Sequence, residues 1–260
     1  MDQCLSSVEE INARDSAGNT PLHIAAASSP DAAVIRLLLR HGADPLLHNE
    51  ERQAPLHLAA AFTNNPAVIM SLVSYGADVD QLVRDHCLIF TCGTRPLHLA
   101  SKRNDGADII EALVIAGADI NAPNEVDRRP LHVAAQYVSN PDVLNLILHA
   151  GGEVSDVDEE GLTPLHLAAY YNSAEVVRVL LEAGGSADER NELDATPLHY
   201  AASSSEGGDQ NVLMRFELLL SESSRKCDAD EAGRTALSMA QNNEVLHGTP
   251  EYWQLNQECN

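Results

Sequence analysis

The chain has 260 residues, of which 39 are Asp or Glu and 16 are Lys or Arg, so its formal net charge is −23. This balance argues against binding to nucleic acid, whose phosphates require a basic surface, and against binding to anionic membranes. It favours a protein partner with a basic surface, although a high net charge also serves solubility alone. No apolar run is long enough to span a bilayer.

The cysteines and the first residues indicate a cellular compartment. Five cysteines are present, an odd number without the spacing of a disulfide framework. The segment that begins at Met1 lacks the basic stretch and apolar run of a signal peptide. We therefore predict an intracellular, reducing location, the cytoplasm.

One short phrase, Xaa-Pro-Leu-His, recurs along the chain. Its histidines follow one another at intervals of 33 to 41 residues and are His23, His57, His98, His132, His166 and His199. A degenerate seventh copy is Thr235-Ala236-Leu237-Ser238. Self-similarity at a fixed period predicts repeats that stack on their neighbours, so that the body elongates without a single globular core.

The phrase and its period resemble the ankyrin repeat, and the cleanest copy is Thr163–Ala169. The resemblance implies an all-α repeat solenoid, in which two helices and a β-hairpin loop make each repeat. We expect a single ankyrin-repeat domain over residues 1–260, with six repeats and a C-terminal capping unit. The expected segments are a short N-terminal cap at 1–11, repeats at 12–48, 49–81, 82–123, 124–157, 158–190 and 191–229, and the cap at 230–260.

The first repeat shows how each unit is built. Thr20 is expected to cap its first helix, with Pro21 at the first helical position, where a missing N–H costs nothing. Pro30 is expected to open the second helix, which is apolar nearly all round and therefore buried on most sides. Gly42 is expected to end that helix in a left-handed conformation.

The period lengthens once, between the second and third repeats. The extra residues, 81–93, are β-branched and aromatic with turn residues at both ends, which predicts an extended hairpin. Its apolar tip, Leu88, Ile89 and Phe90, either binds a partner or folds back onto the stack. His86, Cys87 and Cys92 lie close enough in sequence to suggest zinc, but without a CxxC pair we predict no metal site and no cofactor.

The C-terminal segments are less regular. Residues 203–210, between the helices of the sixth repeat, have the composition of a flexible loop. Thr249 and Pro250 are expected to start the last helix, whose Trp253 would cover the end of the core.

The repeated histidines are expected to be structural. Residues one repeat apart lie in different layers of a stack, so they cannot converge on one metal ion. The resemblance implies instead that each ring forms a hydrogen bond to backbone between repeats.

The resemblance also implies where partners bind: just after the Ala-Ala pair of each first helix, and at the hairpin tips. Aromatic residues, which are enriched in interface hot spots, occur at these positions. The alternative is that some of them, including one tyrosine of the pair at 170–171, pack between helices. The residues carried over are Phe62, Lys102, Arg103, Gln136, Tyr137, Tyr170 and Tyr171.

Acidic residues recur at the expected hairpin tips, and Glu159 and Glu160 are counted among the residues expected to bind a partner. They are either a solvated face or a rim that attracts a basic partner. The recurring acids are Glu50, Glu51, Glu125, Glu159, Glu160, Glu192 and Glu231.

No catalytic motif is present: the chain has no Gly-x-Ser-x-Gly, no phosphate-binding glycine-rich loop and no HExxH. We therefore predict a non-enzymatic protein-interaction module, a monomer that acts as a scaffold. Three biological settings stay open: an adaptor in its own cell, an effector that acts in a host cytosol, or an immunity protein that sequesters a basic toxin or enzyme.

Overall fold

The computed structural model describes residues 8–29, 31–83, 93–206 and 208–259. Every regular element in these ranges is a helix, and the one strand-like pairing among them is an isolated bridge between Ala229 and Thr235. The predicted all-α repeat solenoid is therefore confirmed, while the hairpin loops are turns without a strand ladder. In these ranges no helix has the length and apolarity needed to cross a membrane.

The chain forms two compact units, residues 1–126 (unit 1) and 127–260 (unit 2). The helices of unit 1 are α1 (Val8–Ile11), α2 (Pro21–Ser28), α3 (Ala32–Arg40), α4 (Pro55–Phe62), α5 (Pro66–Ser74), α6 (Pro96–Ala100) and α7 (Ala107–Ile115). Those of unit 2 are α8 (Pro130–Tyr137), α9 (Pro141–His149), α10 (Pro164–Tyr171), α11 (Ala174–Glu182), α12 (Pro197–Ser203), α13 (Asp209–Glu222), α14 (Ala236–Gln241) and α15 (Pro250–Cys259). The single domain expected over residues 1–260 stays a prediction.

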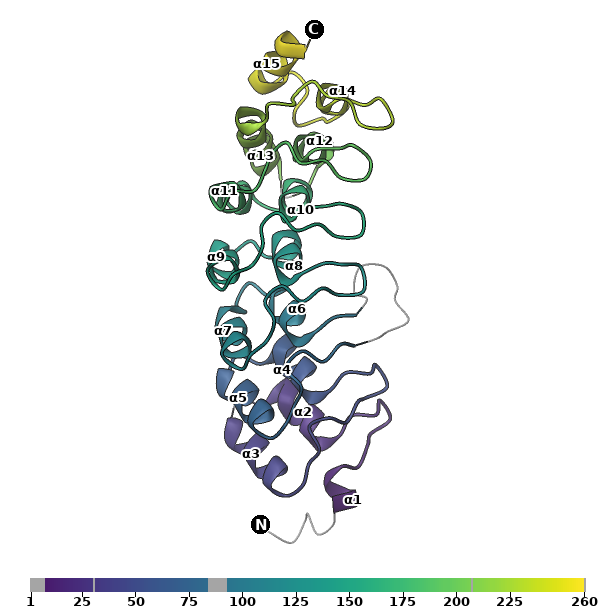
Figure 1. Ribbon diagram of the computed structural model, residues 1–260, viewed down its shortest axis with the longest axis vertical. Coiled ribbons are helices and arrows are strands. Elements are labelled where there is room, and N and C mark those ends of the chain that lie inside the picture. Colours follow the sequence, from purple (N-terminus) through teal and green to yellow (C-terminus); the bar gives the residue numbers. More distant parts are fainter. Residues whose placement is uncertain (1–7, 30, 84–92, 207, 260) are drawn as a thin grey trace. The chain divides into compact units, whose positions relative to one another are not determined.

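Each unit contains two rows of helices (Figure 1). In unit 1 the first helices of the repeats, α2, α4 and α6, pack in one row, and α3, α5 and α7 pack in a second row. In unit 2 the corresponding rows are α8, α10, α12 and α14, and α9, α11, α13 and α15. We call the first row the inner helices and the second the outer helices. In each unit the hairpin turns extend from the row of inner helices (Figure 1).

The repeated phrase starts the inner helices with a cap, which is reciprocal at α2 and α10, where a threonine precedes the proline. At α4, α6 and α8 the residue before the proline is Ala or Arg, and only its N–H donates to the histidine Nδ1. At α10 the Thr163 hydroxyl accepts a bond from the His166 backbone N–H at 3.4 Å, and the Thr163 N–H donates to His166 Nδ1 at 3.2 Å. Pro164 occupies the first helical position, which has no need of an N–H. The outer helix α3 begins at Ala32, with Asp31 as its N-cap, so the predicted start at Pro30 was two residues early.

The histidine of the phrase also joins consecutive repeats. His132 Nε2 lies 3.0 Å from the Leu162 carbonyl oxygen, and His166 Nε2 lies 3.1 Å from that of Ala195. Because Nδ1 accepts from the cap N–H, Nε2 carries the proton and donates. The same bond is made by His23, His57 and His199, which confirms the expected structural role at these five positions.

A second link between repeats is made by asparagine side chains that come shortly after an inner helix. Asn172 Nδ2 donates to the carbonyl oxygens of Ala135 and Val138 in the preceding repeat, each at 2.9 Å. Asn243 makes the corresponding pair of bonds to Ala202 and Ser204, at 3.0 and 2.9 Å. These side chains satisfy carbonyls that the end of the previous inner helix leaves free.

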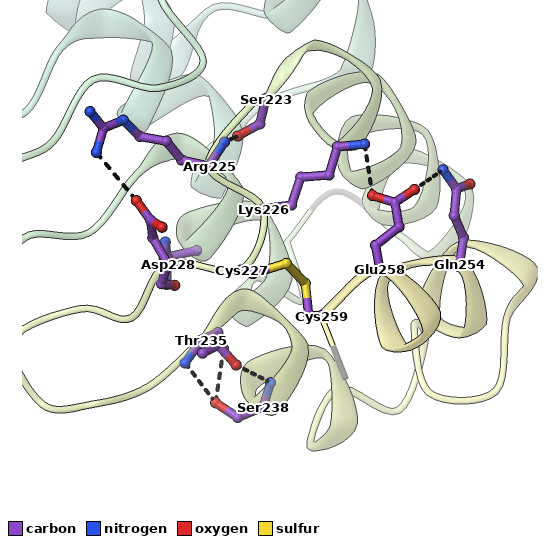
Figure 2. The surroundings of a disulfide bond; sticks show 11 residues. Ser223, Arg225, Lys226, Cys227, Asp228, Thr235, Ser238, Gln254, Glu258 and Cys259 are labelled. Carbon is purple, nitrogen blue, oxygen red and sulfur yellow. Dashed lines mark hydrogen bonds and ion pairs between the residues drawn. A yellow bond between two sulfur atoms is a disulfide. The ribbon is translucent and has the colours of Figure 1, made fainter.

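In unit 2 a disulfide joins Cys227, which follows α13, to Cys259 at the end of α15 (Figure 2). The sequence pattern did not predict this pairing. Beside it, Lys226 Nζ forms an ion pair with Glu258 at 2.9 Å. The prediction that Trp253 covers the core was wrong: Trp253 is exposed, and its neighbour Tyr252 is buried. The helix α15 is rotated so that Tyr252 and Leu255 face inward, three residues apart on one side.

Candidate functional site

Four tyrosines lie on the inner helices of unit 2. Tyr137 ends α8, Tyr170 and Tyr171 end α10, and Tyr200 lies in α12. The rings of Tyr170 and Tyr171 meet edge to face with centroids 4.7 Å apart, and Tyr170 and Tyr200 are 6.3 Å apart. Tyr137 and Tyr171 are exposed, whereas Tyr170 and Tyr200 are half-buried. We call these four residues the tyrosine surface.

Tyr200 was not among the predicted site residues. It follows the histidine of the phrase, where the other repeats carry aliphatic residues. Its ring packs edge-on against His166 at 5.5 Å, and its hydroxyl accepts a bond from Asn191 Nδ2 at 3.0 Å. The change from an aliphatic residue to tyrosine at this position was the sequence signal that could have identified Tyr200 as a site residue. Tyr200 extends the tyrosine surface from α10 to α12.

Tyr171 and Tyr200 are neutral at physiological pH. Burial, together with the nearby charges of Glu160 and Asp158, raises the pKa of Tyr200 to about 12. Burial likewise raises the pKa of Tyr171, with contributions from Tyr170, Tyr137 and Glu160. Neutral phenol rings beside carboxylates suit a partner with apolar and positively charged groups.

A buried ion pair lies near the tyrosine surface. Arg128 Nε lies 2.9 Å from Asp158 Oδ2, and 5% and 1% of these two side chains are exposed. Arg128 Nη1 also donates to Gln136 Oε1 at 3.1 Å. Gln136, which the sequence predicted to bind a partner, is thus half-buried and bonded inside the unit, and the tyrosine beside it is the exposed member of the pair.

The predicted acidic residues of unit 2 lie on consecutive turns that are bonded to one another. The Glu192 N–H donates to the Glu160 carbonyl at 3.1 Å, and the Glu231 N–H donates to the Leu193 carbonyl at 3.0 Å. Gly161 permits the first contact: its φ is +74°, and a Cβ there would lie 2.8 Å from the Glu192 nitrogen. Glu159, like these other glutamates, is exposed, so the carboxylates form an acidic row along the turns.

The predicted site residues of unit 1 differ in exposure and in hydrogen bonding. Phe62 is exposed at the end of α4, and Lys102 is exposed after α6. Arg103 is engaged within the unit: its guanidinium donates to the carbonyl oxygens of Ala60 and Thr63, at 3.2 and 2.6 Å. It therefore links repeats as Asn172 does.

Several predicted residues lie outside the described ranges. They are the apolar tip Leu88, Ile89 and Phe90, and the candidate zinc ligands His86, Cys87 and Cys92.

A family model described as ankyrin repeats (3 copies) matches residues 2–83, 26–124 and 131–216, which together span most of the chain. The chain is an ankyrin-repeat protein. Ankyrin repeats are generally protein–protein interaction modules, so the tyrosine surface and the acidic row lie in a domain of the kind that binds proteins.

A solved structure supports the same assignment. The crystal structure of the ankyrin repeat domain of Bcl-3, a unique member of the IkappaB protein family, is similar to this ankyrin-repeat chain with a TM-score of 0.67 and 26% identity. The match covers 88% of this chain and 97% of that chain. Among curated proteins, no sequence matches significantly.

Proposed function

We propose that this ankyrin-repeat protein is a non-enzymatic binding module that holds a partner protein against the tyrosine surface and the acidic row of unit 2. The observation that carries the proposal is the exposure of Tyr171 and Tyr137 beside two further tyrosines. Large aromatic rings exposed together are unusual on a surface without a partner, and tyrosine is enriched among hot-spot residues.

The charge of the surroundings supports a partner protein with a basic surface. Unit 2 holds 23 Asp and Glu against 8 Lys and Arg, a net charge of −15. This negative charge raises the association rate of a positively charged protein and disfavours binding of nucleic acid and anionic lipid. Of the three settings, sequestration of a basic toxin or enzyme agrees best with this charge, and adaptor and host-directed effector roles use the same surface.

Phe62 and Lys102, the two exposed residues among those predicted in unit 1, belong to the proposed binding set as well. So do Leu88, Ile89 and Phe90. We leave out Arg103, because its guanidinium links two repeats. The protein is proposed to act as a monomer in the cytoplasm. There glutathione and thioredoxin keep thiols reduced, so a cytoplasmic location implies that Cys227 and Cys259 are free thiols in the cell.

A quantitative pull-down from native lysate tests the proposal. The bait is the wild-type chain, the double variant Tyr137→Ala/Tyr171→Ala, or the control variant Tyr75→Ala. Tyr75 is 43% exposed, as is Tyr171, but it lies at the end of the outer helix α5. We expect partners that Tyr75→Ala recovers as well as wild type does and that the double variant recovers at a tenth of that level or less, since hot-spot truncation costs about 2 kcal/mol or more.

Equal recovery of the same proteins by all three baits would contradict the proposal. Circular dichroism and the unfolding midpoint of each bait, measured beforehand, ensure that a loss of recovery is not a loss of fold.

A further inference from the structure

A cleft lies between α12 and α14 of unit 2, next to the tyrosine surface. Its narrow end has a volume of about 200 Å³ and is lined by Leu193, Tyr200 and Met239, among others. A wider part of about 600 Å³ continues from it toward Asn243 and Glu244. The two parts share Ser203, Arg234 and Met239 in their walls, so they form one continuous depression. Tyr200 belongs both to the narrow end and to the tyrosine surface.

The narrow end has apolar walls at Leu193 and Met239, beside polar groups of Ser203 and Arg234, and is partly open to solvent. Leu193 stands on the turn before α12 with 52% of its surface exposed. The corresponding position in the preceding turn is Glu160, so a leucine here departs from the acidic character of the turns. The side chains of Leu193, Met239 and Tyr200 offer a site where an aliphatic group can displace water.

The charge around the cleft is negative. Arg234, the one basic residue among its lining residues, is held by Asp230 through an Nη2–Oδ2 contact of 2.7 Å and an Nε–Oδ2 contact of 2.8 Å. Its charge is therefore balanced within the unit. Glu192 and Glu231 flank Leu193 on the bonded turns, and Glu244 lines the wider part; all three are exposed.

We infer that this cleft is an anchoring subsite for an extended, positively charged protein segment. An aliphatic side chain of the segment occupies the narrow end between Leu193, Tyr200 and Met239. Lysine or arginine side chains on either side of this anchor pair with Glu192 and Glu231, and the segment continues over Tyr170 and Tyr171. The inference rests on the proposed function, because it assigns the kind of polypeptide that the tyrosine surface holds and the place where it is anchored.

Selection of peptides on the full chain tests this assignment. A random peptide library displayed on phage is selected against the immobilised wild-type protein, and the enriched peptides are synthesised with a fluorescent label. Their dissociation constants are then measured for wild type, Leu193→Asp, Leu46→Asp and Tyr137→Ala/Tyr171→Ala. Leu46 is the matched control, because it is 47% exposed on a turn of unit 1.

We expect enriched peptides with a net positive charge and a shared aliphatic residue. Leu193→Asp should weaken their binding about tenfold or more, while Leu46→Asp leaves it unchanged. Exchange of the aliphatic residue for serine should have a similar effect on the wild-type protein. Higher salt should also weaken binding, since the paired charges are exposed.

Three results would overturn the inference. Peptides that depend on Tyr137 and Tyr171 but not on Leu193 would leave the proposed function standing and remove the cleft from it. Peptides whose binding depends neither on Leu193 nor on Tyr137 and Tyr171 would contradict the assignment of the cleft as an anchoring subsite. The absence of any enriched peptide would contradict it as well. Should Leu193→Asp fail to fold, Met239→Gln carries the same expectation, because Met239 also lines the narrow end.

Discussion

Arg128 and Asp158 join consecutive turns of unit 2 through a buried ion pair, with 2.9 Å between Arg128 Nε and Asp158 Oδ2. Asp158 also caps its own turn, since Oδ1 accepts the N–H groups of Glu160 and Leu162 at 3.0 and 2.9 Å. Arg128→Leu would leave this carboxylate buried without its cation. We expect a loss of about 3–5 kcal/mol in the free energy of unfolding, measured by urea denaturation.

The exposed ion pair between Arg190 and Asp228 provides the comparison, with 29% and 37% of the side chains exposed. Arg190→Ala should cost about 1 kcal/mol or less. The double variant Arg128→Leu/Asp158→Asn, which removes both charges, should be more stable than Arg128→Leu. A similar small cost for both single arginine variants would show that the buried pair does not hold the turns together.

The repeated histidines make stability depend on pH. Burial lowers the pKa of His57, His132 and His166 to about 4, against an ordinary value of 6.5. These rings are neutral in the folded protein, whereas in the unfolded chain they bind protons once the pH falls below about 6.5. Stability should therefore fall as the pH is lowered from about 6.5 to about 4, by up to about 1.4 kcal/mol per pH unit for each histidine.

Urea denaturation at several pH values between 7.5 and 4 measures this dependence. His166→Gln should be less stable at pH 7 and should show a shallower decline with acidification. An unfolding midpoint that stays constant down to pH 4.5 would contradict the assignment of neutral, backbone-bonded rings.

The disulfide between Cys227 and Cys259 encloses the whole capping unit, since the two residues are 32 apart in sequence. Closure of a loop of this length stabilises the folded state by roughly 3–4 kcal/mol. Cys227→Ser/Cys259→Ser should accordingly increase amide hydrogen exchange in α14 and α15 while α10 keeps its protection. A reducing agent should produce the same increase in the wild type and no further increase in the variant. If neither the substitutions nor the reducing agent changed the exchange in α15, the disulfide would not stabilise this helix.

The paired bonds from Asn172 to Ala135 and Val138 hold two repeats of unit 2 in register. Asn172→Ala leaves two buried carbonyl groups without a donor, and we expect a loss of about 2–3 kcal/mol. Asn242 is exposed and donates at 3.0 Å to Ser238 within its own helix end, so Asn242→Ala should cost about 0.5 kcal/mol or less. Comparable unfolding midpoints for the two variants would contradict the linking role.

Much of the fold could be predicted because its determinants are local and repeated. The cap at Thr163, the proline after it and the glycine turns depend on residues within a few positions of one another. The bond from His166 to the next repeat is not local, but it recurs with the period, and the family resemblance supplied it. The predicted helix starts were accurate where the Thr-Pro-Leu-His phrase is complete. The start predicted at Pro30 was wrong, because the N-cap of that helix is Asp31.

The parts of the candidate site that escaped prediction depend on neighbours from other repeats. Arg103 occupies a position expected to bind a partner, yet the carbonyls of the preceding repeat lie within its reach. Tyr200 joins the tyrosine surface only because α10 and α12 pack side by side. The pairing of Cys227 with Cys259 and the inward rotation of Tyr252 both follow from how α15 folds back, which spacing in the sequence does not reveal.

The central claim, that a partner protein contacts the tyrosine surface, is tested most directly by photo-crosslinking in native lysate. The chain carries the photoreactive amino acid benzoylphenylalanine in place of Tyr171 or, as the control, in place of Tyr75. We predict that irradiation joins a discrete protein to position 171 and not to position 75, and that the Leu193→Asp substitution reduces the yield. Crosslinks to the same proteins from both positions, or from position 75 alone, would contradict the claim.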